Sequence, residues 1–324
     1  MRFIDWFAGV GGFRRGMELC GHKCVGFCEF DKFAVMSYTS MHLITEEQRA
    51  CLETLDQKAR QKEILKEEYR NGEWYANDVR TVDARSIPDA ECWCFGFPCQ
   101  DISISGKQLG FTGNRSSLFF RIMYLLGQLE EEKRPTYLFI ENVKNLLSVN
   151  GGWDFARLLV ELDRGGYDAE WQVLNSKNFG VPQNRERCFV IGHFRARSKT
   201  KIFPLEGTDG ADYTYRVIQI GRDETRKREN PQAYRVYAIN GVSPTLTDMG
   251  GGGREPHIID PINNKIRKLT PKECFRLQGW TDDYYKKAEY VNSDTQLYKQ
   301  AGNGVTVNVI KAIAEKFHGE EVNT

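Results

Sequence analysis

The chain of 324 residues is long enough for a large hydrophobic core and for two domains. It has 45 Lys and Arg against 44 Asp and Glu, so it is not a polycation, and nucleic-acid binding would have to come from a local basic surface. No apolar run approaches the ~20 residues of a membrane span or resembles a signal peptide, and the nine cysteines have no paired spacing. We therefore expect a cytoplasmic protein with free thiols.

The chain opens with a short apolar run, residues 3–7, which predicts a strand. A glycine-rich turn, residues 8–13, and a helical pattern through Leu19 follow it. This order is typical of the first unit of a nucleotide-binding α/β fold, where glycines let the backbone approach a ligand. The spacing is not G-x-G-x-x-G, so a dinucleotide is not implied, and a purely structural turn is an equal alternative.

Further strands are predicted at residues 24–28, 91–97, 135–140, 171–174 and 188–192. Polar clusters follow these strands, and open parallel sheets keep their ligand sites at that edge. Glu29 and Asp31 end the second strand, where an acid can hold a ribose, although Asp31 could instead be the first acid of a helix. The charged residues 45–70 predict one exposed helix without chemistry.

Cys99 lies in the stretch Phe95–Gln100, where Gly96 and Pro98 predict a stiff turn after a buried strand. Taken alone, a free cysteine is more often a small buried hydrophobe than a reactive group. A zinc site is disfavoured, because Cys92, Cys94 and Cys99 have no CxxC spacing and no histidine lies near them. The polar residues 101–113 predict a loop that closes over a site.

The character of the chain changes near His193. The segment 195–274 contains 15 Lys and Arg against 10 Asp and Glu, with short β-like pieces such as residues 234–239. A mixed-charge, β-rich domain is the simplest interpretation of this modest basic bias. Helical periodicity returns after Thr270, and Thr270, Pro271 and Glu273 form a complete helix start, with an N-cap, a proline at N1 and an acid at N3.

Taken together, six motifs in this order resemble the C5-cytosine DNA methyltransferases of the short bacterial or phage type. They span almost the whole chain: residues 7–13, 96–100, 141–143, 183–187, 267–274 and 302–305. The resemblance implies an α/β fold, with a large Rossmann-like domain that depends on S-adenosylmethionine and a small, mostly β domain that recognises DNA. We expect the large domain to comprise residues 1–192 and 271–324, and the small domain residues 193–270.

The resemblance assigns catalysis to Cys99, Glu141, Arg185 and Arg187. A thiolate that adds to carbon 6 of cytosine makes carbon 5 nucleophilic, while an acid at N3 and guanidinium donors at O2 disperse the charge on the ring. Cys99 would be the nucleophile, Glu141 the acid, and the two arginines the donors. By themselves, Glu141 could be a turn residue and the arginines a solvated strand edge.

The implied methyl donor is S-adenosylmethionine, which is converted to S-adenosylhomocysteine, and no metal is implied. Glu29 would take the ribose, Phe30 would stack near adenine, and Asp78 would contact its amino group. The residues that the resemblance assigns to this ligand are Phe7, Ala8, Gly9, Gly11, Gly12, Phe13, Glu29, Phe30, Asp78, Val79, Gly96, Pro98, Leu118, Asn303, Gly304 and Val305.

The implied substrate is double-stranded DNA, from which the target base must be flipped. The expected DNA contacts are Ser103, Ser105, Lys107, Arg115, Gln183, Gln232, Arg235 and Thr245. Arg235 would read a guanine and Gln232 would fill the place of the flipped base, although for Arg235 a phosphate contact or a pair with an acid is an equal alternative.

Two other functions belong to different classes: methylation of cytosine in tRNA, and binding of DNA or cofactor without catalysis. We expect a monomer that acts in a bacterial or phage-infected cell, with any cognate restriction endonuclease acting separately.

Overall fold

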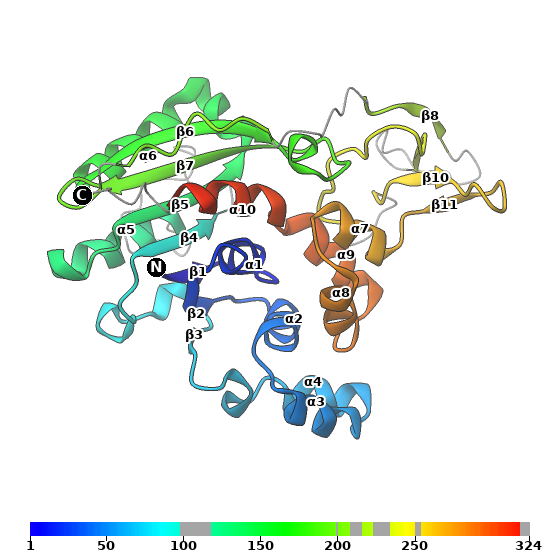
Figure 1. The fold of residues 1–324 in the computed structure, drawn as a ribbon, viewed down its shortest axis with the longest axis horizontal. Coiled ribbons are helices and arrows are strands. Elements are labelled where there is room, and N and C mark those ends of the chain that lie inside the picture. The colour runs from blue at the N-terminus through cyan, green and yellow to red at the C-terminus, as the bar shows by residue number, and fades with distance from the viewer. Residues whose placement is uncertain (98–117, 199, 208–215, 223–233, 250–253, 318–324) are drawn as a thin grey trace.

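The computed structural model describes residues 1–97, 118–198, 200–207, 216–222, 234–249 and 254–317, which form two sheets with surrounding helices (Figure 1). The large sheet has the order β3-β2-β1-β4-β5-β7-β6 and the small sheet the order β11-β10-β9-β8. The large-sheet strands are β1 Arg2–Trp6, β2 Lys23–Cys28, β3 Trp74–Ala76, β4 Cys92–Gly96, β5 Tyr137–Val143, β6 Tyr167–Asn175 and β7 Glu186–Phe194. The small-sheet strands are β8 Gln219–Arg222, β9 Arg235–Tyr237, β10 His257–Ile259 and β11 Ile266–Lys268.

The described α-helices lie between and after the strands of the large sheet. Those before β5 are α1 Gly12–Glu18, α2 Lys32–His42, α3 Glu46–Glu53, α4 Gln57–Glu63 and α5 Leu118–Gln128. Those after β5 are α6 Trp153–Arg164, α7 Pro271–Leu277, α8 Asp282–Glu289, α9 Asp294–Asn303 and α10 Val307–Ala314. None of them is long and apolar enough to cross a membrane.

The large sheet is mixed rather than parallel throughout. Strands β1 to β5 pair in parallel, but β7 runs antiparallel to both β5 and β6. The reason is the short connection between β6 and β7, residues 176–185, which is too short for the crossover that a parallel pair needs. As a result the start of β7 lies beside the end of β5, and Arg187 pairs with Val143. Of the polar residues 183–187, residues 183–185 lie in the connection that follows β6, and residues 186–187 begin β7.

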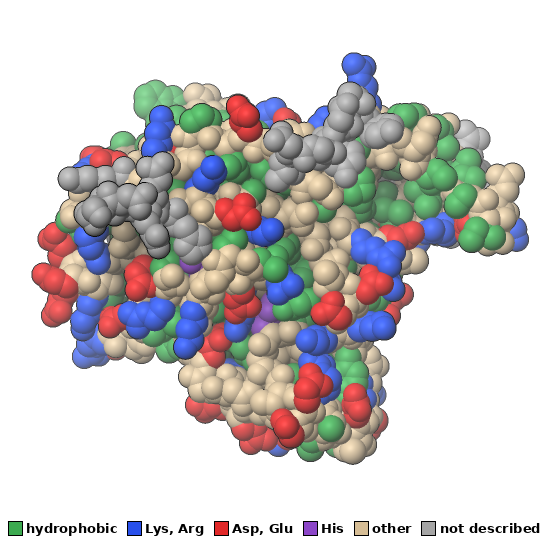
Figure 2. Space-filling view, viewed as in Figure 1, with side chains coloured by type: hydrophobic (Ala, Val, Ile, Leu, Met, Phe, Trp, Pro, Cys, Tyr) green, Lys and Arg blue, Asp and Glu red, His purple; other side chains and the backbone are tan. Residues whose placement is uncertain are grey.

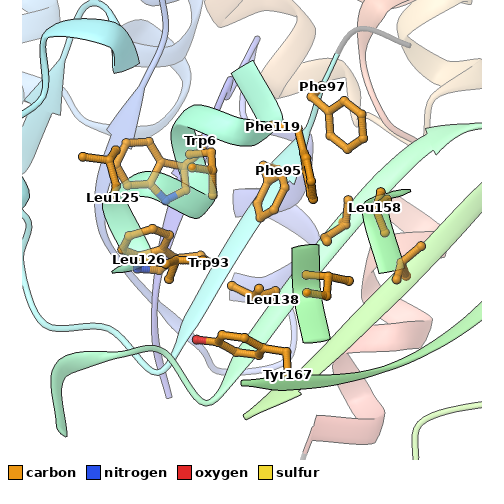
Figure 3. Packing of buried hydrophobic residues seen from close by; sticks show 14 of the residues in the cluster. Trp6, Trp93, Phe95, Phe97, Phe119, Leu125, Leu126, Leu138, Leu158 and Tyr167 are labelled. Carbon is orange, nitrogen blue, oxygen red and sulfur yellow. The ribbon is translucent and has the colours of Figure 1, made fainter. Parts of the chain in front are cut away.

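Side chains of the central strands alternate between two buried layers, as the period of a β-strand requires. Trp6, Trp93 and Phe95 face a cluster with α5 and α6 (Figure 3). Phe3 and Phe139 face the opposite cluster with α1 and α10. The sheet is therefore covered on both faces, and its ligand site must lie at an edge.

Elements from the beginning and the end of the described chain, α1 and α10, pack against each other (Figure 1). A Cβ on Gly12 would lie 2.6 Å from Cγ2 of Val305, and a Cβ on Gly16 would lie 2.6 Å from Cβ of Ile310. These close approaches need glycine at both positions of α1. The loop before α10 is thereby held against the turn that follows β1.

The segment 45–70 is not the single exposed helix that its charge predicts. Asp56 accepts a hydrogen bond from the N–H of Ala59 and begins a second helix, α4, directly after α3. Leu52 and Ile64 are fully buried, in a cluster with Val291. Although apolar residues are sparse in this segment, Leu52 and Ile64 pack it against Val291, which follows α8.

Near the small sheet, the predicted helix start at Thr270 is confirmed. Thr270 and Glu273 form a reciprocal capping box at the beginning of α7, with Pro271 at its first position. On the face seen in Figure 2, basic and acidic side chains are intermingled, and apolar side chains are prominent over the small sheet. Among the described residues of this face, no charged surface of a single sign is seen.

Candidate functional site

A cavity of about 700 Å³ opens at the carboxyl edge of the large sheet, between the turn after β1 and the C-terminal segment. It contains most of the residues that the sequence assigned to a ligand. Its lining includes Phe7, Ala8, Gly9, Gly12, Phe13, Glu29, Phe30, Asp78, Val79, Gly96, Leu118, Asn303, Gly304 and Val305, together with Glu141, Arg185 and Arg187. Residues from strands, turns and helices far apart in the sequence thus share one space.

Glu29 lines the cavity next to the turn that follows β1. Its Oε2 accepts a hydrogen bond of 2.8 Å from the N–H of Gly9, and its Oε1 one of 2.7 Å from the N–H of Asp31. Burial raises the pKa of Glu29, and these backbone donors oppose the rise. The backbone of residue 9 has φ 54°, in the left-handed region, which favours glycine because it has no Cβ. The turn therefore holds the carboxylate while oxygen lone pairs stay available for hydroxyl donors.

Phe30 and Asp78 also line the cavity, close to each other through Arg80. The Phe30 ring is 65% exposed, and the guanidinium carbon of Arg80 lies 5.7 Å from its centroid. Arg80 also donates hydrogen bonds to both oxygens of Asp78 and holds the pKa of that carboxyl below its usual range. An exposed ring beside an ionised carboxylate is suited to a flat, hydrogen-bonding heterocycle.

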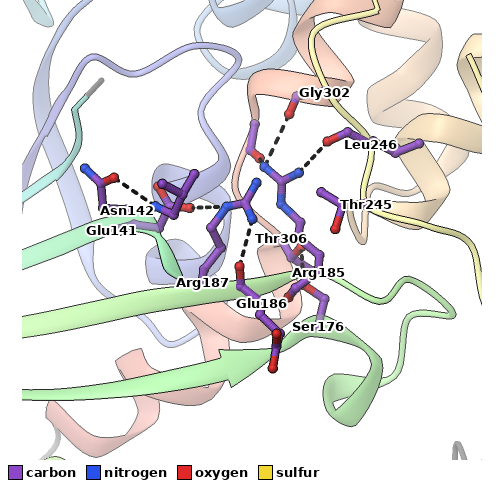
Figure 4. A network of polar contacts seen from close by, with 12 residues as sticks. Glu141, Asn142, Ser176, Arg185, Glu186, Arg187, Thr245, Leu246, Gly302 and Thr306 are labelled. Atoms are coloured by element: carbon purple, nitrogen blue, oxygen red, sulfur yellow. Dashed lines mark hydrogen bonds and ion pairs between the residues drawn. The ribbon is translucent and has the colours of Figure 1, made fainter. Parts of the chain in front are cut away.

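Glu141 and Arg187 form an ion pair at the far end of the cavity (Figure 4). Nε of Arg187 lies 3.1 Å from Oε1 of Glu141, and the two side chains are only 15% and 12% exposed. The antiparallel pairing of β5 with β7 brings them together. Gly96 closes the same corner, because a Cβ there would lie 2.9 Å from Oε2 of Glu141.

Asn142 fixes the backbone beside this pair. Its Nδ2 donates a hydrogen bond of 2.8 Å to the carbonyl of Phe97, at the end of the segment that leads toward Cys99. The end of β5 is thereby tied to the chain immediately before that cysteine. The sequence motif contained Asn142, but only the structure shows what it holds.

Arg185 points away from Glu141, although the sequence assigned both arginines the same role. Its guanidinium donates to the carbonyls of Leu246, Gly302 and Gly304, and its side chain is almost fully buried (Figure 4). Burial, with a smaller contribution from Arg187, lowers the pKa of Arg185 to about 9. It is therefore a cation at neutral pH that binds three backbone carbonyls from two segments of the chain.

Two expected DNA contacts have hydrogen-bond partners within the protein. Gln183 is fully buried, donates to the carbonyl of Leu277 and accepts from the N–H of Leu246. The Thr245 hydroxyl donates a hydrogen bond of 2.6 Å to the carbonyl of Asn184. Both ends of the Gln183 amide thus have protein partners, and a contact of Gln183 with DNA stays a prediction.

The remaining predicted residues are scattered. Gly11 does not line the cavity, and it lies at the start of α1 with φ 84°, where a Cβ would meet the ring of His42. Arg235 is half-buried on β9, directly opposite Arg222 of β8. Outside the described residues lie Pro98, Cys99, Ser103, Ser105, Lys107, Arg115 and Gln232.

The structure adds residues to the cavity that the sequence analysis missed. Lys299 forms an ion pair of 2.7 Å with Asp31, and Thr247, Asp248 and Gln300 also line the space. No local pattern marks them, because Lys299 and Gln300 reach the cavity from α9, and Thr247 and Asp248 reach it from the segment between β9 and β10. In the described part of the chain, no cluster of His, Cys, Asp or Glu is arranged to hold a metal ion.

Comparison with known proteins finds relatives that match almost the whole chain. The family model described as C-5 cytosine-specific DNA methylase matches residues 1–209 and 198–319. The Type II methyltransferase M.HhaI of Haemophilus parahaemolyticus is 32% identical over 97% of this chain and 93% of its own, and M.Bsp6I of Bacillus sp. (strain RFL6) is 34% identical over 98% of both. The S. pombe Dnmt2 methyltransferase structure aligns over 97% of both chains with a TM-score of 0.69 and 16% identity, a likeness of fold.

Proposed function

The chain belongs to the C-5 cytosine-specific DNA methylases and is a DNA (cytosine-5)-methyltransferase, and we propose that it methylates a flipped cytosine within a short sequence of double-stranded DNA. The observation that best supports the proposal is the Glu141–Arg187 pair at the end of the cavity. It lies beside the end of β4, just before the segment that contains Cys99. An acid, a guanidinium and a nucleophile are the groups that this reaction requires.

The proposed reaction begins when the Cys99 thiolate adds to carbon 6 of the flipped cytosine. Glu141 donates a hydrogen bond or proton at N3, and Arg187 stabilises the charge that develops at O2. S-adenosylmethionine supplies the methyl group that carbon 5 then takes up. Transfer of the proton from carbon 5 to solvent water, with the electron pair of that bond expelling the thiolate from carbon 6, would then restore the aromatic ring and free Cys99.

The described residues fit the methyl donor. We propose that Glu29 receives the ribose hydroxyls, that Phe30 and Asp78 accompany the adenine, and that residues 7–13 and 303–305 enclose the remainder. Support comes from the two backbone donors that hold Glu29 and from Gly12, whose missing Cβ admits Val305. Pro98 belongs to the same proposal, although it lies outside the described residues.

We propose that residues 193–270 form the DNA-recognition domain and that residues 1–192 and 271–324 form the catalytic domain. The small sheet, which lies wholly within 193–270, supports this division. The loop residues Ser103, Ser105, Lys107 and Arg115 would then close on the DNA from the catalytic side.

Arg235 is proposed to contact a guanine next to the target cytosine. Methylation of a randomised DNA library by Arg235→Ala, read by bisulfite sequencing, is expected to show relaxed specificity at one position, with a loss of about 1–3 kcal/mol in discrimination. Wild-type protein on the same library is the control. An unchanged motif at lower overall yield would instead identify a phosphate contact.

The relatives M.HhaI and M.Bsp6I are named Type II methyltransferases, and we propose the same place in a restriction-modification system for this chain. It would act as a monomer in the cytoplasm, with any cognate endonuclease acting separately.

Incubation with S-adenosylmethionine labelled in its methyl group, together with either duplex DNA or tRNA, tests the proposed function. Label in DNA is expected. Label in tRNA alone would favour an RNA methyltransferase, and label in neither would favour a silent relative.

A further inference from the structure

The backbone of Leu246 is held from both sides by one short stretch of chain. Its N–H donates a hydrogen bond of 3.0 Å to Oε1 of Gln183, and its carbonyl accepts one of 2.8 Å from Nη1 of Arg185. Leu246 itself is buried, in a cluster with Phe275 and Ala301. The position of residues 246–248 against the cavity is therefore fixed by the residues that precede β7 (Figure 4).

The same guanidinium also binds the backbone of residues 302–304, which line the cavity as well. Nη2 of Arg185 donates to the carbonyl of Gly304 at 2.8 Å and to that of Gly302 at 3.2 Å. The two walls touch directly as well, because a Cβ on Gly302 would collide with the carbonyl of Thr247. One side chain thus connects the segment entering from the small-sheet region with the loop proposed to enclose the methyl donor.

Stability alone does not account for a cation at this place. Arg185 is 3% exposed, and its three hydrogen-bond acceptors are backbone carbonyls rather than carboxylates. Removing a charge from water costs several kcal/mol, and apolar residues often replace buried ionic groups without loss of stability. What an apolar side chain could not do is bond to three carbonyls from two separate segments at once.

We infer that Arg185 is a positioning residue that couples binding of the methyl donor to binding of DNA. The inference rests on the proposed function, since it takes residues 303–305 as a donor wall and residues 193–270 as the DNA domain. When the methyl donor binds, it orders the backbone of residues 302–304. This backbone then orders the guanidinium of Arg185, and the guanidinium in turn orders Leu246. By linkage, each ligand then raises the affinity for the other by the same factor.

The test measures the dissociation constant of S-adenosylhomocysteine by calorimetry, with and without a saturating duplex that carries the sequence found by bisulfite sequencing. For wild-type protein the duplex is expected to tighten binding by about 5- to 150-fold, the usual range of coupling between two sites. For Arg185→Met this ratio is expected to fall close to one, even where each ligand alone also binds more weakly.

Arg60 offers a matched control far from the cavity. It too donates to three backbone carbonyls, those of Leu52, Leu55 and Tyr290. Arg60→Met removes the same kind of tether and is expected to keep the wild-type ratio. Arg185→Lys keeps the cation but cannot reproduce the planar fork, so it should also lose most of the ratio while preserving the fold.

Each outcome decides the question. A wild-type ratio retained in Arg185→Met or Arg185→Lys contradicts the coupling, as does a wild-type ratio of one in protein that binds both ligands. If both Arg185 variants are unfolded by circular dichroism, the guanidinium supports the fold and the inference fails. Wild-type protein that binds neither ligand overturns the proposed function itself, which separates the two failures.

Discussion

Replacing Cys99 with serine is expected to abolish methylation, with a fall in turnover on the order of 10³-fold or more. A serine hydroxyl supplies no usable anion at neutral pH, whereas a thiol does. The measurement is incorporation of labelled methyl groups into DNA under single-turnover conditions. Wild-type protein should in addition be trapped covalently on DNA that contains 5-fluorocytosine, because the fluorine blocks the last elimination.

Other cysteines make poor candidates for the same role. Burial, with nearby acids, raises the pKa of Cys188 and of Cys274 to about 12, so their thiolates are scarce at neutral pH. The exposed Cys51 provides the control, and Cys51→Ser should keep wild-type turnover. Near-normal turnover in Cys99→Ser, or no covalent trapping of the wild type, would contradict the assignment.

Glu141→Gln is expected to lower the rate of methyl transfer by about 10²- to 10⁴-fold, the usual contribution of a general acid or base. The amide oxygen can still accept a hydrogen bond from Arg187, so the corner of the cavity should keep its shape. Glutamine, however, has no carboxyl proton to share with N3 of the base.

The measurement separates chemistry from binding. Single-turnover rates should fall in Glu141→Gln, while the dissociation constant for S-adenosylhomocysteine stays close to wild type. Glu161→Gln on α6, where the half-buried carboxylate pairs with Arg164, serves as the control for loss of a carboxylate. A weakened donor affinity with an unchanged rate would place Glu141 in donor binding instead.

Local patterns predicted much of the large domain. The apolar run at residues 3–7 and the glycine turn after it placed the first strand and the start of α1 correctly. Glu29 could be placed in the cavity because it ends a strand, and parallel strands carry their carboxyl ends to one edge. The N-cap at Thr270 could be predicted from Thr270, Pro271 and Glu273 alone.

The different orientations of Arg185 and Arg187 could not be predicted. Two residues apart on a strand they would share a face, but β7 begins at Glu186, so the alternation does not extend to Arg185. Its direction depends on Leu246, Gly302 and Gly304, which are distant in sequence. The burial of Gln183 has the same cause, since its partners Leu246 and Leu277 come from later segments.

Bisulfite sequencing of a plasmid from a methylation-free host that expresses the chain tests the central claim most directly. The account predicts fully protected cytosines at one position of a short recurring sequence, and no protected cytosines when the host expresses Cys99→Ser. Protection that is absent from the wild type, or that persists unchanged in Cys99→Ser, would contradict it.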